Sequence, residues 1–261
     1  MNSLIDQLVY YYNSRLQDDI MHNIACYIID HINDIESITA KKIVHDCYTS
    51  LTTVNKFSRL FGTGNFNMFK NLLIAHRVIK MKQVFNRYEN TNFNQLYDVY
   101  VSSCHGQDVY DQDYLFSLAN KIAELIHETN RVNFYGAIFP LSLIFNFQVD
   151  FITIGKPVFI YTPKDDYQGY LLNDDDLSII LSITGSYITL AKREFMDIYH
   201  SGTKKVFVSQ KSDVVLEYIN NFDEHFCLPN HCEKVESNYI ILLLFDLVRY
   251  FYIKRYVIME K

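Results

Sequence analysis

The short stretch "SITGSY", residues 182–187, combines hydroxyl-bearing residues with a glycine. An apolar run ends just before it and a helical pattern begins just after it. Serine and threonine hydroxyls, with the free N–H groups of a helix start, suit an anion such as phosphate. The same residues are common in turns that bind nothing, so the stretch alone leaves both interpretations open. The candidate ligand-binding residues of this turn are Ser182, Thr184, Gly185, Ser186 and Tyr187.

Basic side chains are concentrated in a different part of the chain. Between Thr39 and Tyr88 there are nine Lys and Arg residues against a single acid, Asp46, which gives this region a net charge of +8. The remaining residues include 15 basic and 29 acidic ones, and the whole chain has a net charge of −6. A compact basic region on an acidic chain predicts one domain that meets phosphates and another that does not.

Residues 39–62 within the basic region predict two helices separated by a three-residue break, with Ser50 capping the second helix. We expect one face of the second helix to be buried through Leu51, Val54, Phe57 and Phe61. Two helices with a tight turn and a polar, basic outer face enter the DNA major groove in many regulators. A solvated helical surface is the alternative. The candidate DNA-binding residues are Ser50, Thr52, Thr53, Asn55, Lys56 and Arg59.

Hydrophobic periodicity changes along the chain and predicts two domains. Residues 1–85 are helical in pattern throughout, and residues 86–110 are predicted to be a polar linker. From residue 111 to residue 261, five apolar runs alternate with helical segments, which predicts a parallel sheet covered on both faces. The fold class is therefore an all-α domain followed by an α/β domain.

Composition restricts the classes of protein to consider. The longest apolar stretch is interrupted by Asp246 and Arg249, so no membrane span is expected. Five cysteines without framework spacing and the absence of a secretory leader predict a cytoplasmic protein. The last helix, around residues 242–247, has more apolar residues than one buried stripe needs. We therefore expect part of it to pack across a subunit interface in a homodimer or homotetramer.

The second predicted helix and the residues after it resemble a known motif. The stretch "TSLTTVNKFSRLFGTGNFNMFK" is similar to the helix-turn-helix signature of the RpiR/MurR family of bacterial transcription regulators. The matching positions are Ser50, Thr53, Val54, Phe57, Gly62, Phe66, Phe69 and Lys70. The chain departs from the signature at Lys56, Phe61 and Asn65. The resemblance implies that this region binds double-stranded DNA.

Members of that family have a C-terminal sugar isomerase (SIS) domain, a five-stranded parallel sheet of flavodoxin-like order, and the second half of the chain resembles it. The segments that match are "FYGAIFPLSLIFNFQVDFITIGK", "LSIILSITGSYITL" and "SNYIILLLFDLV". The resemblance implies that the loops after the first and third strands hold a phosphorylated sugar, which adds Gly136 and Ser142 to the ligand-binding candidates. In the first loop, however, Ile138 and Pro140 stand where the family has glycine and serine.

These departures leave two functions open within one class. The first is a transcription regulator of a sugar or amino-sugar gene set, modulated by a phosphorylated sugar. The second is a regulator whose SIS domain serves only oligomerisation or a different ligand. Isomerase activity is not expected, because Tyr187 is the only ionisable side chain of the two loops and Glu194 lies further along the next helix.

No cofactor or metal is expected either. The set His225, Cys227, His231 and Cys232 contains the residue types that bind zinc. Its spacing is not that of finger or ribbon sites.

Overall fold

The fold was determined as a computed structural model, which describes residues 3–14, 19–103, 110–163, 172–210, 213–228 and 235–258. The chain divides into two compact units. The first unit contains Met1–Arg87 and Gln148–Val158, and the second contains Tyr88–Phe147 and Phe159–Lys261. The domain boundaries predicted from the sequence differ from this division in where residues 86–110 and 148–158 belong.

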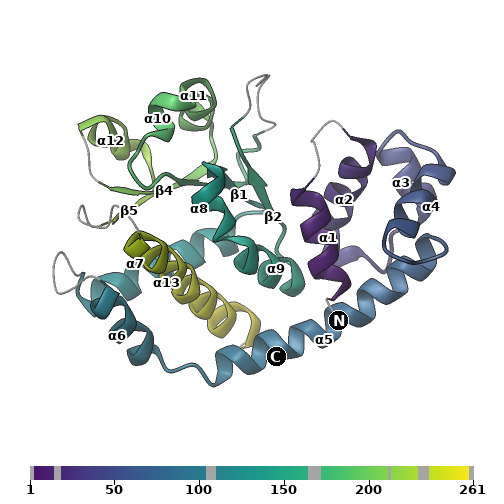
Figure 1. Ribbon diagram of the computed structural model, residues 1–261, viewed down its shortest axis with the longest axis horizontal. Helices are drawn as coiled ribbons and strands as arrows, with labels where there is room; N and C mark the ends of the chain where they lie inside the picture. Colours follow the sequence, from purple (N-terminus) through teal and green to yellow (C-terminus); the bar gives the residue numbers. More distant parts are fainter. Residues whose placement is uncertain are drawn as a thin grey trace. The chain divides into compact units, whose positions relative to one another are not determined.

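The first unit is helical, as its periodicity indicates. Its helices are α1 (Leu4–Asn13), α2 (Ile20–Asp30), α3 (Ala40–Asp46), α4 (Leu51–Leu60), α5 (Phe66–Glu89) and the short 3-10 helix η1 (Ile32–Asp34). Helix α1 begins with a capping box, in which Ser3 and Asp6 each accept a hydrogen bond from the other's main-chain N–H. Figure 1 shows α1 to α4 gathered along one side of the N-terminal part of α5. The core of the unit therefore lies on one side of that long helix.

Most of helix α9 (Phe145–Ile154) is also part of the first unit. Its buried Gln148 exchanges two hydrogen bonds with Asn13 near the end of α1, at 2.7 and 3.3 Å. After α9, the side-chain nitrogen of Asn33 donates to the carbonyl of Gly155 at 2.6 Å. These contacts explain why residues 148–158 group with the helical unit and not with the sheet.

The second unit is built on a five-stranded sheet. Its strands are β1 (Val132–Gly136), β2 (Val158–Tyr161), β3 (Leu177–Leu181), β4 (Lys204–Gln210) and β5 (Glu224–Leu228). They lie in the order β2-β1-β3-β4-β5, and the pairings β1 with β3, β3 with β4 and β4 with β5 are parallel. This confirms the predicted parallel sheet and its flavodoxin-like order, in which the direction of winding reverses between β1 and β3.

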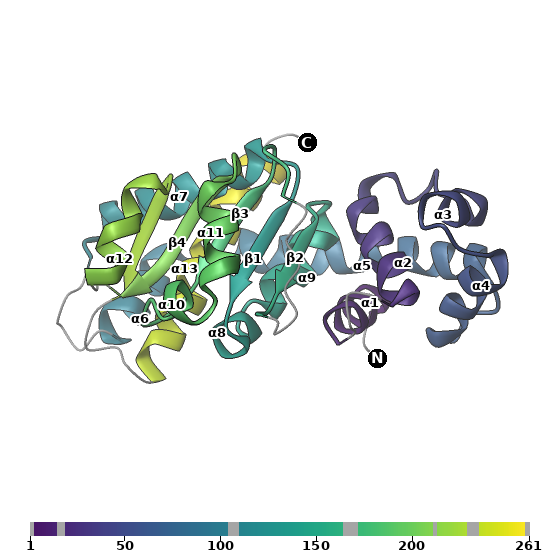
Figure 2. The ribbon, with the colours of Figure 1, turned by 90° about the horizontal axis from the view of Figure 1, so that it is seen from above.

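Helices cover both faces of the sheet. They are α6 (Phe93–Ser103), α7 (Gln112–Glu128), α8 (Ile138–Ser142), α10 (Tyr187–Leu190), α11 (Lys192–His200), α12 (Asp213–Tyr218), η2 (Ile219–Asn221), α13 (Val235–Tyr252) and a π-helix (Ile253–Ile258). Figures 1 and 2 show α10, α11 and α12 over one face, and Figure 1 shows α7 and α13 over the other. Tyr135, Ile180 and Phe207 of the strands pack with α10 and α11 in one core cluster. The strands are therefore apolar on both faces, which produced the continuous apolar runs of the sequence.

Helix α13 is buried within a single copy of the chain. Leu243, Leu244, Phe245 and Leu247 are all at most 5% exposed, and the helix packs against α6 and α7. The ring of Phe245 meets the rings of Phe134 and Phe147 edge to face, with centroids 5.4 and 5.2 Å away. Most of the apolar surplus that was expected to mark a subunit interface is therefore used inside the second unit, and the homodimer or homotetramer stays a prediction.

The predicted linker, residues 86–110, contains regular structure. It includes the end of α5 and the whole of α6, and α6 packs against α13 in the second unit. Much of this segment is thus an integral part of the second unit, although its polar composition indicated a connection. Within the ranges that the structure describes, no helix is long and apolar enough to cross a membrane.

We expect Gly155→Ala to destabilise the chain more than Gly62→Ala. Both glycines have positive φ, +101° and +74°, which costs an L-residue about 1–2 kcal/mol. A Cβ at Gly62 would meet nothing within 4 Å, whereas one at Gly155 would lie 2.0 Å from the side-chain oxygen of Asn33. That clash should add about 1–3 kcal/mol. The urea midpoints of the two variants measure the difference, and equal losses would contradict the close approach of Asn33.

Candidate functional site

Helices α3 and α4 are joined by a short turn whose geometry is fixed by caps. Thr39 accepts a hydrogen bond from the N–H of Lys42 at 3.2 Å, and Ser50 accepts one from the N–H of Thr53 at 3.1 Å. In the turn, Tyr48 has a positive φ of 50° and is 95% exposed. The predicted pair of helices with a short break and a Ser50 cap is therefore present.

One face of α4 is held against the rest of the first unit. Val54 and Phe57 are fully buried, and the ring of Phe57 meets that of Phe69 on α5 at 5.6 Å, edge to face. Phe61 is half-buried and contacts both rings. Leu51, which was expected on this face, is instead 52% exposed, because it lies in the first turn of α4, beside the exposed loop. Packing through Val54 and Phe57 leaves the opposite face of α4 open.

The six candidate DNA-binding residues differ in their freedom to contact a partner. Thr52, Lys56 and Arg59 are exposed. Ser50 and Thr53 are bonded to each other through their hydroxyls at 2.9 Å, in addition to the cap. The half-buried Asn55 accepts a hydrogen bond at 3.3 Å from the first N–H of α5. Thr52, Lys56 and Arg59 are thus the candidates that can contact a binding partner without breaking one of these local hydrogen bonds.

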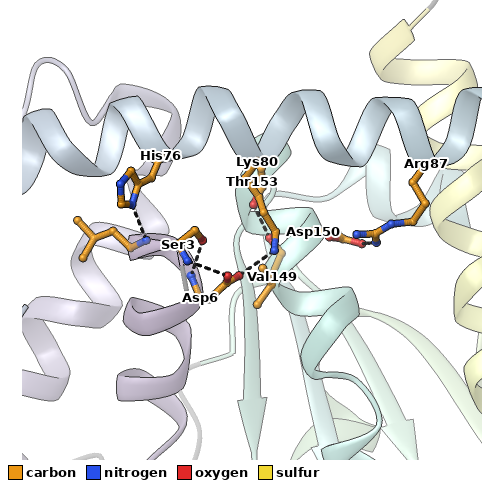
Figure 3. Close-up of polar contacts among 9 residues, drawn as sticks. Ser3, Asp6, His76, Lys80, Arg87, Val149, Asp150 and Thr153 are labelled. Carbon is orange, nitrogen blue, oxygen red and sulfur yellow. Dashed lines mark hydrogen bonds and ion pairs between the residues drawn. The ribbon is translucent and has the colours of Figure 1, made fainter. Parts of the chain in front are cut away.

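Four of the nine basic residues of the region are used inside the first unit. They are Lys70, Arg77, Lys80 and Arg87, all on α5. Lys80 pairs with Asp6 of α1 at 3.0 Å, and Arg87 pairs with Asp150 of α9 at 2.8 Å (Figure 3). The side chain of Asp150 is only 3% exposed, so Arg87 neutralises a buried carboxylate.

The other two internal bases bind main-chain oxygens. Arg77 donates to the carbonyls of Ile32 and Thr153, both at 2.8 Å, and Lys70 donates to two carbonyls in the segment before α3. The sequence suggested that the whole net charge of +8 could meet phosphates. Part of that charge is instead used in contacts inside the first unit. Apart from Arg87, which is exposed but paired with Asp150, the exposed basic residues of the region are Lys41, Lys42, Lys56, Arg59 and Lys82.

The single acid of the basic region is engaged locally. Asp46, at the end of α3, is bonded to His45 and to the hydroxyl of Tyr27, each at 2.7 Å. The hydrogen bond with His45 is the main cause that holds the pKa of Asp46 below its ordinary value. In the turn that follows, burial raises the pKa of the Cys47 thiol to about 11, so this thiol stays protonated near neutral pH.

The two loops expected to bind a ligand begin side by side. Strands β1 and β3 are adjacent and parallel, and their last residues, Gly136 and Leu181, are opposite each other. A Cβ at Gly136 would lie 2.2 Å from the carbonyl oxygen of Leu181, so the close approach requires glycine. This is the position at which open α/β sheets hold ligands, beyond the carboxyl ends of the strands at the reversal of winding.

The loop after β1 offers an apolar surface. It forms the short helix α8, in which Ile138 and Phe139 are 73% and 57% exposed and Pro140 is buried. Ser142 is exposed, and its hydroxyl donates to the carbonyl of Phe139 at 2.7 Å. The hydroxyl of Ser142, a predicted ligand-binding residue, is thus bonded within its own helix.

The loop after β3 uses part of its polar groups internally. The buried Ser182 accepts a hydrogen bond from the N–H of Tyr187 at 3.0 Å. Gly185 has a φ of +76° and donates its N–H to the carbonyl of Ser182. Thr184 and Ser186 are exposed. Of the turn's serine and threonine hydroxyls, those of Thr184 and Ser186 are the accessible ones.

Tyr187 points away from the loop and into the protein. It is 4% exposed, and its hydroxyl donates to the carboxylate of Glu194 at 3.1 Å. Glu194 is seven residues after Tyr187, so its position in the sequence does not place it at the loop. The break in the helix at Ala191, between α10 and α11, brings the two side chains together. Beneath the loops, burial raises the pKa of Tyr135 well above its ordinary value.

The two described members of the histidine and cysteine set near β5 make local hydrogen bonds. His225 is bonded to the hydroxyl of Ser209 at 3.1 Å, and the thiol of Cys227 donates to the carbonyl of Leu228. His231 and Cys232 lie outside the described residues. Over the described part of the chain, no group of three or more His, Cys, Asp or Glu side chains could hold a metal ion.

In comparisons with known proteins, no family model and no curated protein matches the chain. Several solved structures are similar to it. The NanR protein of Vibrio vulnificus, complexed with ManNAc-6P, is 16% identical with a TM-score of 0.45, over 97% of this chain and 94% of that one. The sugar isomerase domain of an RpiR transcription factor from Sphaerobacter thermophilus is 14% identical with a TM-score of 0.41, over 66% and 89%.

A proposed phosphosugar isomerase from Bacteroides fragilis is 17% identical with a TM-score of 0.46, over 62% of this chain and 88% of that one. All three similarities are below 25% identity and a TM-score of 0.5. They assign neither a family nor an activity to the chain, so a functional proposal has to rest on its own residues.

We expect Arg87→Ala to destabilise the first unit and Lys82→Ala to leave its stability unchanged. Removing Arg87 leaves the buried Asp150 carboxylate without this partner. Because the Arg87 side chain is 49% exposed and screened, the expected loss is about 1–2 kcal/mol. The exposed Lys82 should change stability by less than about 0.5 kcal/mol. Urea unfolding of both variants measures the difference in the free energy of unfolding. Equal effects would refute the assignment of Arg87, but not Lys82, to a stabilising internal contact.

Proposed function

We propose that the chain is a sequence-specific DNA-binding transcription regulator. The observation that carries the proposal is the open face of α4, on which Thr52, Lys56 and Arg59 are exposed while Val54 and Phe57 anchor the other side. Threonine can read base edges, and lysine and arginine can contact bases or phosphates. The exposed Lys41 and Lys42 on α3, the helix before α4, add positive charge to the same part of the chain. Helix α4 is then the recognition helix of a helix-turn-helix.

The proposed effector is a phosphorylated sugar or amino sugar, held between the loops after β1 and β3. Thr184 and Ser186 are exposed in the second loop and can donate hydrogen bonds to a phosphate. The adjacent carboxyl ends of β1 and β3 support this location. Effector binding would change the affinity for DNA, and the alternative is that the second unit binds another ligand or serves assembly alone.

A sugar isomerase is the second candidate, favoured by one observation. An isomerase needs a base close to its substrate, and Glu194 is joined to the second loop through Tyr187. Its carboxylate is 3% exposed and accepts from that tyrosine, which supports a structural role over proton transfer. Turnover of any phosphorylated sugar that is lost in Glu194→Gln would reverse this judgement.

The double variant Lys56→Ala/Arg59→Ala should bind a fragment from the chain's own promoter region more weakly. If both side chains contact phosphates, the slope of log affinity against log salt should fall by about 2. Lys82→Ala is the matched control, because it removes an exposed base outside α3 and α4. Gel shifts at several salt concentrations measure both, and an unchanged slope in the double variant would exclude α4 as the recognition helix.

Thr184→Val should weaken binding of an effector, while Thr189→Val should not. Both threonines are exposed in the same region, but only Thr184 lies in the turn after β3, before α10. Loss of one good donor to phosphate costs about 1.5–3 kcal/mol, or roughly tenfold to a hundredfold in affinity. A thermal-shift screen of phosphorylated sugars and amino sugars identifies the ligand for this measurement. A panel without any hit would favour the assembly role instead.

A further inference from the structure

Helix α5 has two separate apolar faces, one buried and one exposed. Its inner face is buried in the first unit through Phe66, Phe69, Leu73 and Val84, each at most 1% exposed. These positions, three, four and eleven residues apart, return to the same side of a helix with 3.6 residues per turn. A helix that needed only this packing would be polar on its other side. The other side of α5 is not polar.

The outer face is an exposed apolar stripe, which consists of Met68, Leu72, Ala75 and Ile79. Its residues are separated by four, three and four positions, the spacing of a coiled-coil seam. Met68 is 55% exposed, Leu72 38% and Ile79 57%, and Ala75 is exposed as well. At 100° per residue, they lie about 130° around the helix from the inner face. Four neighbouring apolar side chains in one row mark an interaction surface, unlike scattered single ones.

We propose that the apolar stripe of α5 packs against the same stripe of a second copy of this chain, antiparallel about a two-fold axis at Ala75. A two-fold interface brings one surface against itself, so each residue must fit its symmetry partner. The order of residues along the stripe meets this condition. The small Ala75 is at the centre, where two helices approach most closely, and Leu72 and Ile79 on either side would pack against each other's copies.

The charges around the stripe select the antiparallel arrangement. Lys82 continues the row three residues after Ile79. In a parallel pair the two copies of Lys82 would face each other, whereas an antiparallel pair centred on Ala75 separates them by about 21 Å, fourteen residues at 1.5 Å each. The sequence from Phe66 to Tyr88 contains no acid, so ion pairs between two copies of this segment cannot hold the pair together. The contact is therefore apolar and depends on the four residues of the stripe.

The proposed contact would also fix the two copies of α4 relative to each other. Phe69 of α5 packs on Phe57 of α4 from the inner side, so a pair of α5 helices carries a pair of α4 helices with it. This consequence rests on the proposed DNA-binding function, but the contact between copies does not. The oligomeric state tests the contact without DNA, and therefore a failure of DNA binding and a failure of the contact are distinguishable.

The first experiment compares Ile79→Glu with Val99→Glu. Val99 is 54% exposed on α6 of the second unit, so the two substitutions place a charge on similarly exposed valine or isoleucine side chains. Light scattering at micromolar concentration should find that Ile79→Glu halves the mass of the native species and that Val99→Glu retains it. Both variants should keep the native circular dichroism spectrum. A native chain that is monomeric, or a mass unchanged in Ile79→Glu, overturns the proposal.

The second experiment determines the direction of the helices by disulfide formation. Ala75→Cys should form a cross-linked dimer under mild oxidation, because the two copies of residue 75 meet at the axis. A mixture of Met68→Cys and Lys82→Cys chains should form the mixed dimer, while Met68→Cys alone should not cross-link. The unsubstituted chain, with its five native cysteines, gives the background. Cross-linking of Met68→Cys to itself would refute the antiparallel arrangement.

Discussion

A single guanidinium group joins three segments of the first unit, and much of that unit depends on it. Arg77 of α5 donates to the carbonyl of Thr153 in α9, to the carbonyl of Ile32 and, at 3.1 Å, to the side-chain oxygen of Asn33. Arginine can do this because its donors have fixed, planar directions, whereas a lysine ammonium has one centre of charge. Asn33 in turn donates to Gly155, which is why a side chain at that glycine has no room. The end of α9 and the segment after α2 are thereby held on the inner face of α5.

The same contacts explain how far the sequence could predict the fold. Apolar runs of four to six residues, separated by helical patterns, were sufficient to predict the five strands and their parallel arrangement, because strands buried on both faces leave continuous apolar signals. The polar internal contacts had no comparable signal. Lys70 and Arg77 bind main-chain carbonyls, and every residue of a chain carries one. A basic residue that binds a carbonyl inside the protein therefore looks the same in sequence as one that binds DNA.

Helices α13 and α5 show that the amino-acid composition of a helix does not tell which of its apolar residues are covered. In α13 the apolar surplus is covered by α6, α7 and the sheet, although the sequence suggested a second subunit. In α5 the apolar residues occupy two faces, and the ones that remain exposed are mixed along the sequence with the buried ones, Phe69 and Leu73 among them. Which face of a helix is covered depends on what the rest of the chain brings to it, and one helix's own pattern does not contain that information.

The loops after β1 and β3 show how a turn's own requirements limit what it can offer a ligand. Ser182 satisfies the N–H of Tyr187, and Tyr187 in turn satisfies Glu194, so this chain of contacts turns two polar side chains inward. A ligand between the two loops would meet the exposed hydroxyls of Thr184 and Ser186 on one side and the apolar surface of Ile138 and Phe139 on the other. Covering apolar surface stabilises a complex only where it meets apolar groups of the ligand, by about 25 cal/mol per Å² removed from water. Side-chain hydrogen bonds to the proposed phosphorylated effector would therefore come from the loop after β3, while the loop after β1 would cover apolar carbon-bound parts of the ligand.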